Sequence, residues 1–181
     1  MPAIIRIALA HYQFEALHPF HDGNGRLGRL VIALQLLSAG QLRYPILNIS
    51  TWLEQNRAEY QDGLLRVSQT GDWNPWVRFI ASAIHAEALE VIARVEKLHA
   101  LRRDFQAILQ GAKGVSLRIA DDLIGYPMIT ASVAAKLHGV SYQAANSAIS
   151  KLVALGILRQ RTEGRYDRIF QSDAVLIALG Y

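Results

Sequence analysis

Residues 18–29, His-Pro-Phe-His-Asp-Gly-Asn-Gly-Arg-Leu-Gly-Arg, gather the side chains of this sequence that are best suited to chemistry. Gly23 and Gly25 allow backbone conformations that other residues avoid, so successive N–H groups can point into one concavity, a nest that binds anions. Arg26 and Arg29 lie three residues apart, so on a helix they share one face and add two positive charges. The segment therefore predicts a polyphosphate site at the start of a helix.

Two further side chains of the same segment indicate a reaction at phosphorus. Asp22 would repel a phosphate as a bare anion, but it suits a Mg²⁺ ion that bridges phosphate oxygens. His18 precedes the nest, and histidine is a common general base, so it is a candidate base for the attack of a hydroxyl group on phosphorus. A plainer alternative makes Asp22 a helix cap, the glycines a turn and the arginines solvated charges, but it does not explain why all these residues occur together.

Helices are predicted to position these side chains. Apolar residues recur at helical spacing through the first part of the chain, without an alternating strand pattern, so residues 1–111 are expected to form an all-α domain. A short polar, glycine-bearing stretch at 110–114 follows and predicts a domain boundary between residues 111 and 112. The helical ranges are 4–17, 27–39, 50–69 and 75–109.

Residues 112–181 are predicted to form a second, smaller domain. Thr130 and Ser141 are suited to cap helices, and Gly139 allows a tight turn between them, which is the spacing of a helix-turn-helix. A hairpin that turns at Glu163 and Gly164 completes a resemblance to a winged helix. The predicted fold class is mostly α, an all-α core followed by a small winged helix-turn-helix domain with a β-hairpin. The expected helices are 117–124, 130–137 and 141–155, and the expected strands are 157–160 and 169–171.

Composition narrows the class of protein. The 181 residues are 51% hydrophobic and 19% charged, which excludes a disordered or collagen-like chain and permits one good core and a second small one. No apolar run approaches the roughly 20 residues of a membrane span, and the first residues do not resemble a signal peptide. The absence of cysteine excludes disulfides and thiolate metal sites. We expect a cytoplasmic protein with no membrane contact.

The pattern H-P-F-x-D-G-N-G-R-x-x-R over residues 18–29 resembles the signature of the Fic family at every fixed position, with Phe20 as the residue that anchors the loop to the core. Residues 8–17, 56–60 and 71–76 also resemble the helices of that family. The resemblance therefore extends from about residue 4 to about residue 109.

This resemblance implies a protein adenylyltransferase that moves AMP from ATP to a Ser, Thr or Tyr hydroxyl of a target protein. His18 would be the catalytic base and Asp22 the ligand of Mg²⁺. A core or surface role is an equal alternative for Asn56 and Tyr60, which would border the adenine. Relatives that transfer phosphate or phosphocholine are a further alternative, although the complete G-N-G-R with Arg29 favours AMP. The implied nucleotide-binding residues are Gly23, Asn24, Gly25, Arg26, Gly28, Arg29, Asn56 and Tyr60.

Two elements of the family pattern lie upstream of the loop. These are a β-hairpin flap that aligns the target and an inhibitory S/T-x-x-x-E-G/N helix whose glutamate pairs with the last motif arginine, here Arg29. Only 17 residues precede His18, so we expect this chain to lack both, to bind a nucleotide or an anion, and to transfer AMP poorly. Ser50 and Glu54 have the inhibitory spacing, but Gln55 follows them.

A DNA-binding regulator or targeting module with a Fic nucleotide-sensing part is the alternative function. Residues 112–181 hold 8 Lys and Arg against 5 Asp and Glu, so this part is the more basic one. A protein-contact role with merely solvated arginines remains an open alternative. Arg165 and Arg168 would also reach phosphates from the hairpin. The main candidate DNA contacts are Tyr142, Gln143, Asn146, Lys151, Arg159 and Arg161.

Overall fold

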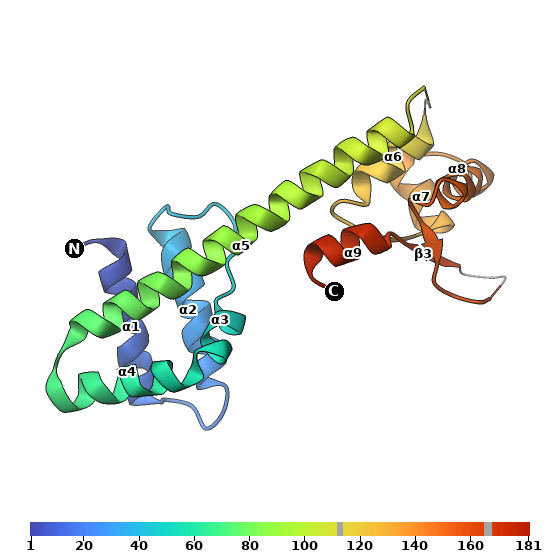
Figure 1. The fold of residues 1–181 in the computed structure, drawn as a ribbon. Helices are drawn as coiled ribbons and strands as arrows, with labels where there is room; N and C mark the ends of the chain where they lie inside the picture. Colours follow the sequence, from blue (N-terminus) through green and yellow to red (C-terminus); the bar gives the residue numbers. More distant parts are fainter. Residues whose placement is uncertain (112–113, 165–167) are drawn as a thin grey trace. The chain divides into compact units, whose positions relative to one another are not determined.

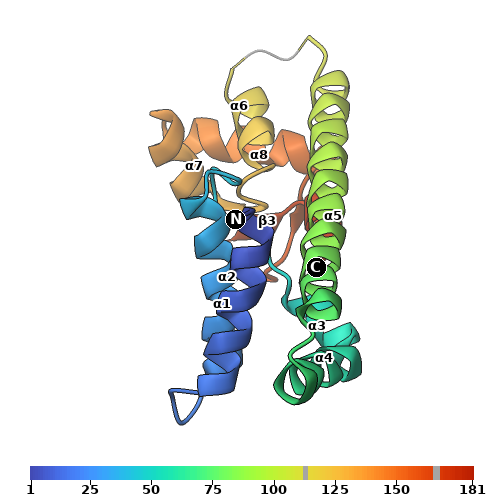
Figure 2. The same cartoon turned by 90° about the vertical axis from the view of Figure 1, so that its left-hand side faces the viewer.

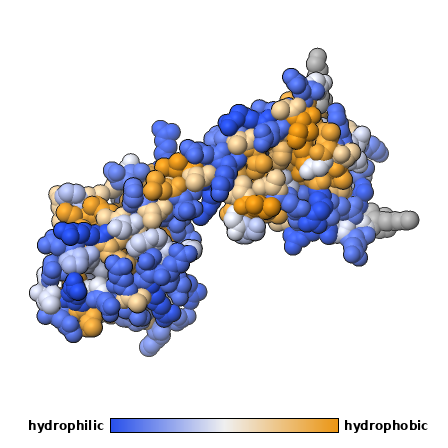
Figure 3. All heavy atoms as spheres, viewed as in Figure 1, coloured by the Kyte–Doolittle hydropathy of each residue, from blue (hydrophilic) through white to orange (hydrophobic). Residues whose placement is uncertain are grey.

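Helices account for most of this protein, and the only sheet among the described residues is small, as the sequence predicted. The computed structural model describes residues 1–111, 114–164 and 168–181 (Figure 1). Contacts divide the chain into two compact units, Met1–Ile92 and Ala93–Tyr181. Among these residues, no helix is both long and apolar enough to cross a bilayer. The face in Figure 3 is mostly hydrophilic, with separate apolar patches.

The first unit contains α1 (Ala3–Leu17), α2 (Asn24–Ser38), α3 (Ser50–Gln55), α4 (Arg57–Thr70) and the first turns of α5 (Trp73–Ile108). Helices α1 and α2 lie side by side (Figures 1 and 2). Gly28 permits this close approach, because a Cβ there would overlap Oε1 of Glu15 and lie 3.0 Å from Cε1 of His11. The helix pair therefore holds the intervening loop at both ends.

The predicted single helix over 50–69 is wrong, because the structure has two helices that meet at Asn56. Asn56 has φ −111° and ψ 32°, and its Nδ2 donates to the carbonyl oxygen of Trp52 at 2.8 Å. Its own carbonyl oxygen accepts from the N–H of Tyr60 at 3.0 Å. One asparagine thus ends α3 and begins α4.

The core of the first unit is built around Trp76, which is fully buried. Its Nε1 donates to the carbonyl oxygen of Ala8 at 2.8 Å, so burial of the indole leaves no unpaired donor. The ring stacks on Phe79 at a centroid distance of 6.0 Å and is tilted against Tyr60 at 5.6 Å. This packing ties α1 to α4 and α5.

The second unit holds the rest of α5 with α6 (Val115–Asp122), β1 (Met128–Thr130), α7 (Ala131–His138), α8 (Tyr142–Ala154), β2 (Arg159–Gln160), β3 (Ile169–Gln171) and α9 (Asp173–Leu179). The antiparallel sheet has the order β1-β3-β2, with Phe170 opposite both Ile129 and Gln160. After α5, the elements of this unit therefore run in the order helix, strand, two helices, two strands and helix.

The predicted caps of the second unit are confirmed. Thr130 Oγ1 accepts from the N–H of Val133, and Ser141 Oγ accepts from the N–H of Ala144, each at 3.2 Å. Gly139 follows α7 with φ 64°, a conformation that favours glycine. These side chains satisfy N–H groups that would otherwise lack partners at the starts of α7 and α8.

Two elements of the second unit were not predicted, namely β1 and α9. A three-residue strand has too few positions to show alternation, and β1 exists because it pairs with β3. The division of the units at Ile92 also differs from the boundary predicted at residues 111 and 112. Phe105 and Leu109 are buried in the core of the second unit, so the end of α5 belongs to it. Residues 112–113 lie outside the described part.

Candidate active site

The catalytic candidate His18 follows directly after α1. Pro19 disfavours helical geometry at the residue before it, so α1 ends at Leu17. His18 has φ 44° and ψ 55°, and among the described residues it is the only non-glycine with a positive φ. Such conformations are unfavourable for most residues and gather at functional sites. The imidazole is exposed to solvent, so it is accessible to a reactant.

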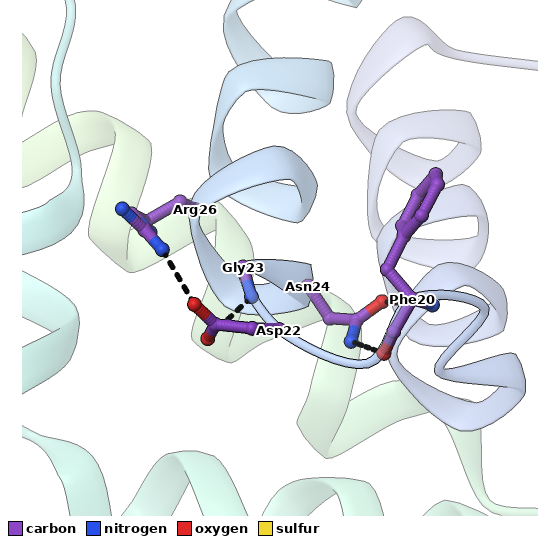
Figure 4. Close-up of polar contacts among 5 residues, drawn as sticks. All are labelled: Phe20, Asp22, Gly23, Asn24 and Arg26. Atoms are coloured by element: carbon purple, nitrogen blue, oxygen red, sulfur yellow. Dashed lines mark hydrogen bonds and ion pairs between the residues drawn. The ribbon is translucent and has the colours of Figure 1, made fainter.

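Asn24 closes the loop between α1 and α2, as Figure 4 shows. Its side chain is buried, accepts from the N–H of Phe20 at 3.0 Å and donates to the carbonyl oxygen of Phe20 at 2.5 Å. Because both ends of the amide are occupied, only the backbone N–H of Asn24 is left for an anion. Phe20 is 51% exposed, and its ring lies 6.4 Å from the Phe14 ring of α1, so Phe20 contacts α1 while about half of it faces solvent.

The start of α2 presents unpaired backbone donors. The first helical bond joins the N–H of Leu27 to the carbonyl oxygen of Gly23, which has φ 84°. No described group accepts from the N–H groups of Asn24, Gly25 or Arg26. These three N–H groups lie at the positive end of α2, where the sequence predicts an anion site, and of the two glycines only Gly23 has a positive φ.

The carboxylate of Asp22 lies beside these N–H groups and does not accept from them. Its Oδ1 accepts from the N–H of Gly23 at 2.7 Å, and its Oδ2 lies 3.1 Å from Nη2 of Arg26 (Figure 4). Both side chains are largely exposed, so the ion pair is weak and easily exchanged. The contacts show that the loop accommodates negatively charged oxygens.

Arg29 lies at the wall of a hollow of about 770 Å³. Its Nε donates to Oγ of Ser50 at 3.0 Å. A Cβ on Gly25 would lie 3.1 Å from Nη1 of Arg29, so the missing side chain lets the guanidinium lie over the first turn of α2. Residues that line the hollow include His18, Gly25, Arg29, Ser50, Tyr60 and Gln61.

A buried polar cluster borders the hollow. His11 Nε2 lies 3.0 Å from the hydroxyl oxygen of Tyr60, and burial, assisted by the charge of Arg29, lowers the pKa of His11 to about 4. His11 is therefore neutral at pH 7. Burial, together with the nearby carboxylate of Glu15, raises the pKa of Tyr60, which keeps its hydroxyl protonated.

Glu15 is the acidic member of this cluster and lines the same hollow. Burial raises its pKa, although His18 and Arg29 act in the opposite direction. No described group forms a hydrogen bond with its Oε1. Neither Glu15 nor His11 was predicted as a site residue. Their spacing of four along α1 places them on one helix face, and that spacing is the signal that could have revealed them.

The remaining candidates of the first unit lie apart from the hollow. The structure brings His18, Gly25, Arg29 and Tyr60 together around it. Gly28 is buried where α1 and α2 pack, and the Asn56 side chain is used at the junction of α3 and α4.

Three of the candidate DNA contacts are engaged within the second unit. Arg159 binds both carboxylate oxygens of Asp173, at 2.6 and 3.1 Å. Arg161 donates to Sδ of Met128 at 3.1 Å. Asn146 Oδ1 accepts from Arg168 at 2.7 Å. The other three, Tyr142, Gln143 and Lys151, are exposed on α8, and Arg165 lies outside the described residues.

Metal ligands are sparse. Residues 1–111, 114–164 and 168–181 contain no group of three or more His, Cys, Asp or Glu side chains that could hold a metal ion. Asp22 is an exposed hard-oxygen donor, which fits Mg²⁺ only if phosphate oxygens and water complete the coordination. The residues present therefore fit a metal that arrives with a polyphosphate.

Comparison with known proteins agrees with this site. Residues 1–36 match the model of the Fic/DOC family, so the resemblance inferred from residues 18–29 is confirmed. The chain is 46% identical over 74 residues to "Protein adenylyltransferase Fic" of Aedes aegypti, covering 41% of this chain and 13% of the relative. It is 42% identical over 87 residues to "Protein adenylyltransferase fic-1" of Caenorhabditis elegans, covering 47% of this chain and 15% of the relative. The matched region is thus less than a sixth of those relatives' length.

Proposed function

We propose that this chain carries the catalytic loop of a protein adenylyltransferase, which transfers AMP from ATP to a Ser, Thr or Tyr hydroxyl of a target protein. The observation that carries the proposal is the hollow that His18 and Arg29 border together with the unpaired N–H groups at the start of α2. The names of the relatives supply the chemical class.

Phosphate oxygens would replace the carboxylate of Asp22 beside Arg26. The N–H groups of Asn24, Gly25 and Arg26 would bind the α-phosphate, where negative charge is concentrated in the transition state. The guanidinium groups of Arg26 and Arg29 would bind the outer phosphates and stabilise the leaving pyrophosphate. Released from Arg26, Asp22 would hold Mg²⁺ on the phosphates, and the ion would neutralise part of their charge.

His18 would supply the proton acceptor. As the acceptor oxygen forms a bond to the α-phosphorus, its proton passes to the imidazole of His18. The bond between the α-phosphorus and its bridging oxygen to the β-phosphate breaks, and pyrophosphate departs with the electron pair. The products are an adenylylated hydroxyl and pyrophosphate, and catalysis comes from positioning and electrostatic stabilisation with one general base.

The nucleoside would occupy the hollow of about 770 Å³ beyond the phosphates. Tyr60 lines that hollow, and its hydroxyl is held by the neutral ring of His11. This contact supports the predicted role of Tyr60 next to the adenine. The same role is less well supported for Asn56, because its side-chain amide already donates to the carbonyl oxygen of Trp52.

AMP transfer from α-labelled ATP with Mg²⁺ tests the proposal in the full chain. Replacing His18 with Ala should reduce labelling of itself or of a partner protein by about 10² to 10⁴-fold, with ATP binding largely retained. His21→Ala is the matched control, because His21 is an exposed loop residue that does not line the hollow. Equal labelling by the His18→Ala variant would contradict the proposed base.

Helix α8 supports a second candidate function in DNA binding. Its cap at Ser141 is formed, and it exposes Tyr142, Gln143 and Lys151 along a helix that stands second in a helix-turn-helix. The hairpin gives less support for DNA binding, because Arg159 is bound to Asp173 and Arg161 donates to Met128. A mobility-shift titration with duplex DNA at several salt concentrations tests this candidate. Binding that does not weaken with salt would exclude phosphate contacts.

A further inference from the structure

Ser50 is the first residue of α3 and lies against the last arginine of the loop. Its Oγ accepts a hydrogen bond from Nε of Arg29 at 3.0 Å, across 21 residues of sequence. Its own N–H donates to Oδ1 of Asn48 at 3.1 Å, which fixes the backbone that carries the hydroxyl. The acceptor for Arg29 is therefore held in place by the fold.

The contact with Ser50 determines which edge of Arg29 remains available. A guanidinium binds an anion in bidentate fashion either through Nε and one Nη or through both Nη groups. Because Nε is already bonded to Ser50, the edge formed by Nη1 and Nη2 is left for an incoming anion. Nη1 also lies over the first turn of α2, where a Cβ on Gly25 would approach to 3.1 Å.

A second, smaller hollow of about 250 Å³ shows what this contact prevents. Arg29 and Ser50 line both this hollow and the one of about 770 Å³ that contains His18. The smaller hollow is otherwise lined mainly by apolar residues, including Leu30, Ala33 and Leu47. Without the Ser50 acceptor, the long Arg29 side chain could rotate toward the smaller hollow.

We propose that Ser50 is a positioning residue, whose hydroxyl holds the Nη edge of Arg29 toward the outer phosphates of ATP at the start of α2. This inference rests on the proposed function of the loop. Ser50 lines the hollow proposed for the nucleoside, but its hydroxyl is bonded to Arg29, so its proposed effect on ATP binding passes through the orientation of Arg29. Loss of the Ser50 hydroxyl should therefore weaken the binding of ATP, which has outer phosphates, and should leave the binding of AMP, which has none, unchanged.

Isothermal titration of the full chain with Mg²⁺-ATP and with AMP tests the proposal. Ser50→Ala should weaken ATP binding about tenfold, the effect of one charge-assisted hydrogen bond, and leave AMP binding unchanged. Ser50→Thr keeps the hydroxyl and should retain most of the affinity. Ser82→Ala, at an exposed serine of α5, is the matched control and should change neither affinity.

A double-mutant cycle separates positioning from a general effect on the fold. In an Arg29→Ala background, Ser50→Ala should have no further effect on ATP binding, because the only route of action has been removed. Equal weakening of ATP and AMP, a full effect in the Arg29→Ala background, or no effect of Ser50→Ala would each overturn the inference.

Inorganic pyrophosphate separates this inference from the proposed function. If Ser50→Ala weakens pyrophosphate binding but the wild-type chain labels no protein, the positioning role stands and the transferase proposal fails. If the wild-type chain transfers AMP and Ser50→Ala binds ATP and pyrophosphate normally, the transferase proposal stands and the positioning role fails.

Discussion

The arginines of the two units lie in opposite environments. In the first unit, Arg26 and Arg29 flank a helix start with unpaired N–H groups, and Arg26 is held only by the exposed carboxylate of Asp22. In the second unit, Arg159 is bound by both oxygens of Asp173, and Arg161 donates to Met128. The first pair is available to a ligand, whereas the second pair stabilises its own surface.

This difference shows that the net charge of a unit does not reveal whether its arginines are available to a ligand. The second unit has the larger excess of basic residues, yet Arg159 and Arg161 are engaged by neighbouring side chains. The first unit is nearly balanced in charge, but a glycine-rich loop concentrates two arginines at the positive end of a helix. The position of an arginine relative to a helix start is therefore a better guide to a candidate anion site than the net charge of the unit.

The largest expected effect follows removal of the arginine pair of the first unit. Arg26→Ala combined with Arg29→Ala should weaken binding of Mg²⁺-ATP about 1000-fold, because two charge-assisted contacts are lost. Arg159→Ala combined with Arg161→Ala should leave ATP binding unchanged. Calorimetric titration measures both. A similar loss in the two variants would mean that ATP responds to general positive charge, and the contrast between the units would be wrong.

The loop shows how far sequence reasoning reaches. The turn at Gly23 and the helices on either side of the loop could be predicted, because glycine favours the positive φ that Gly23 does have. The two bonds between Asn24 and Phe20 could not, because an asparagine in a loop can bond to many backbone groups. The partner of Arg29 lies 21 residues away in Ser50, and only the tertiary fold brings them together.

In the second unit, local features could be predicted from the sequence, but features that depend on distant partners could not. Thr130 and Ser141 were predictable caps, since their effect is local. The strand β1 depends on pairing with β3 about 40 residues later, and no local pattern announces it. The bond between Arg159 and Asp173 likewise joins a strand to a helix that was not predicted. The helix caps could therefore be predicted from local sequence, but the partners of the surface charges could not.

Acid should destabilise the first unit through His11. This ring is fully buried, and its pKa of about 4 in the folded chain lies below the value of 6.5 expected when unfolded. The unfolded chain therefore binds more protons between these values, so stability is fully present above pH 6.5 and falls as the pH drops to 4. The expected loss is roughly 3 kcal/mol.

Tryptophan fluorescence during denaturant unfolding measures this loss in the first unit alone, because Trp52, Trp73 and Trp76 all belong to it. The control is His11→Gln, which removes the titrating group and should flatten the pH dependence while lowering stability overall. Glu15 acts in the opposite direction, because its pKa is raised in the folded chain, so the difference between wild type and variant isolates His11. Identical slopes between pH 4 and 6.5 would show that His11 does not control acid stability.

Glycines with positive φ provide a matched test in both units. Gly23 has φ 84° at the loop and Gly139 has φ 64° after α7, so each replacement by Ala should cost about 1 to 2 kcal/mol of stability. Circular dichroism during denaturation measures both losses. Only Gly23→Ala should also weaken ATP binding, because it distorts the nest. A loss of ATP affinity with Gly139→Ala would show that the nest is not the site of binding.

The smallest expected effect concerns DNA and compares two cations of the second unit. Lys151 is exposed on α8, whereas Arg159 is held by Asp173. If α8 contacts phosphates, Lys151→Ala should weaken binding to duplex DNA about threefold and reduce the slope of log affinity against log salt by about 1. Arg159→Ala should change the slope less, because its charge is already neutralised by Asp173.

Release of Arg159 makes this last comparison decisive. Asp173→Asn removes the carboxylate charge, so Arg159 becomes available to a phosphate and DNA binding should strengthen with a steeper salt dependence. Combining it with Arg159→Ala should cancel that gain, because no freed guanidinium remains. If Arg159→Ala weakens binding as much as Lys151→Ala in the wild-type background, Asp173 does not shield the hairpin, and the second unit would use its arginines as the first unit does.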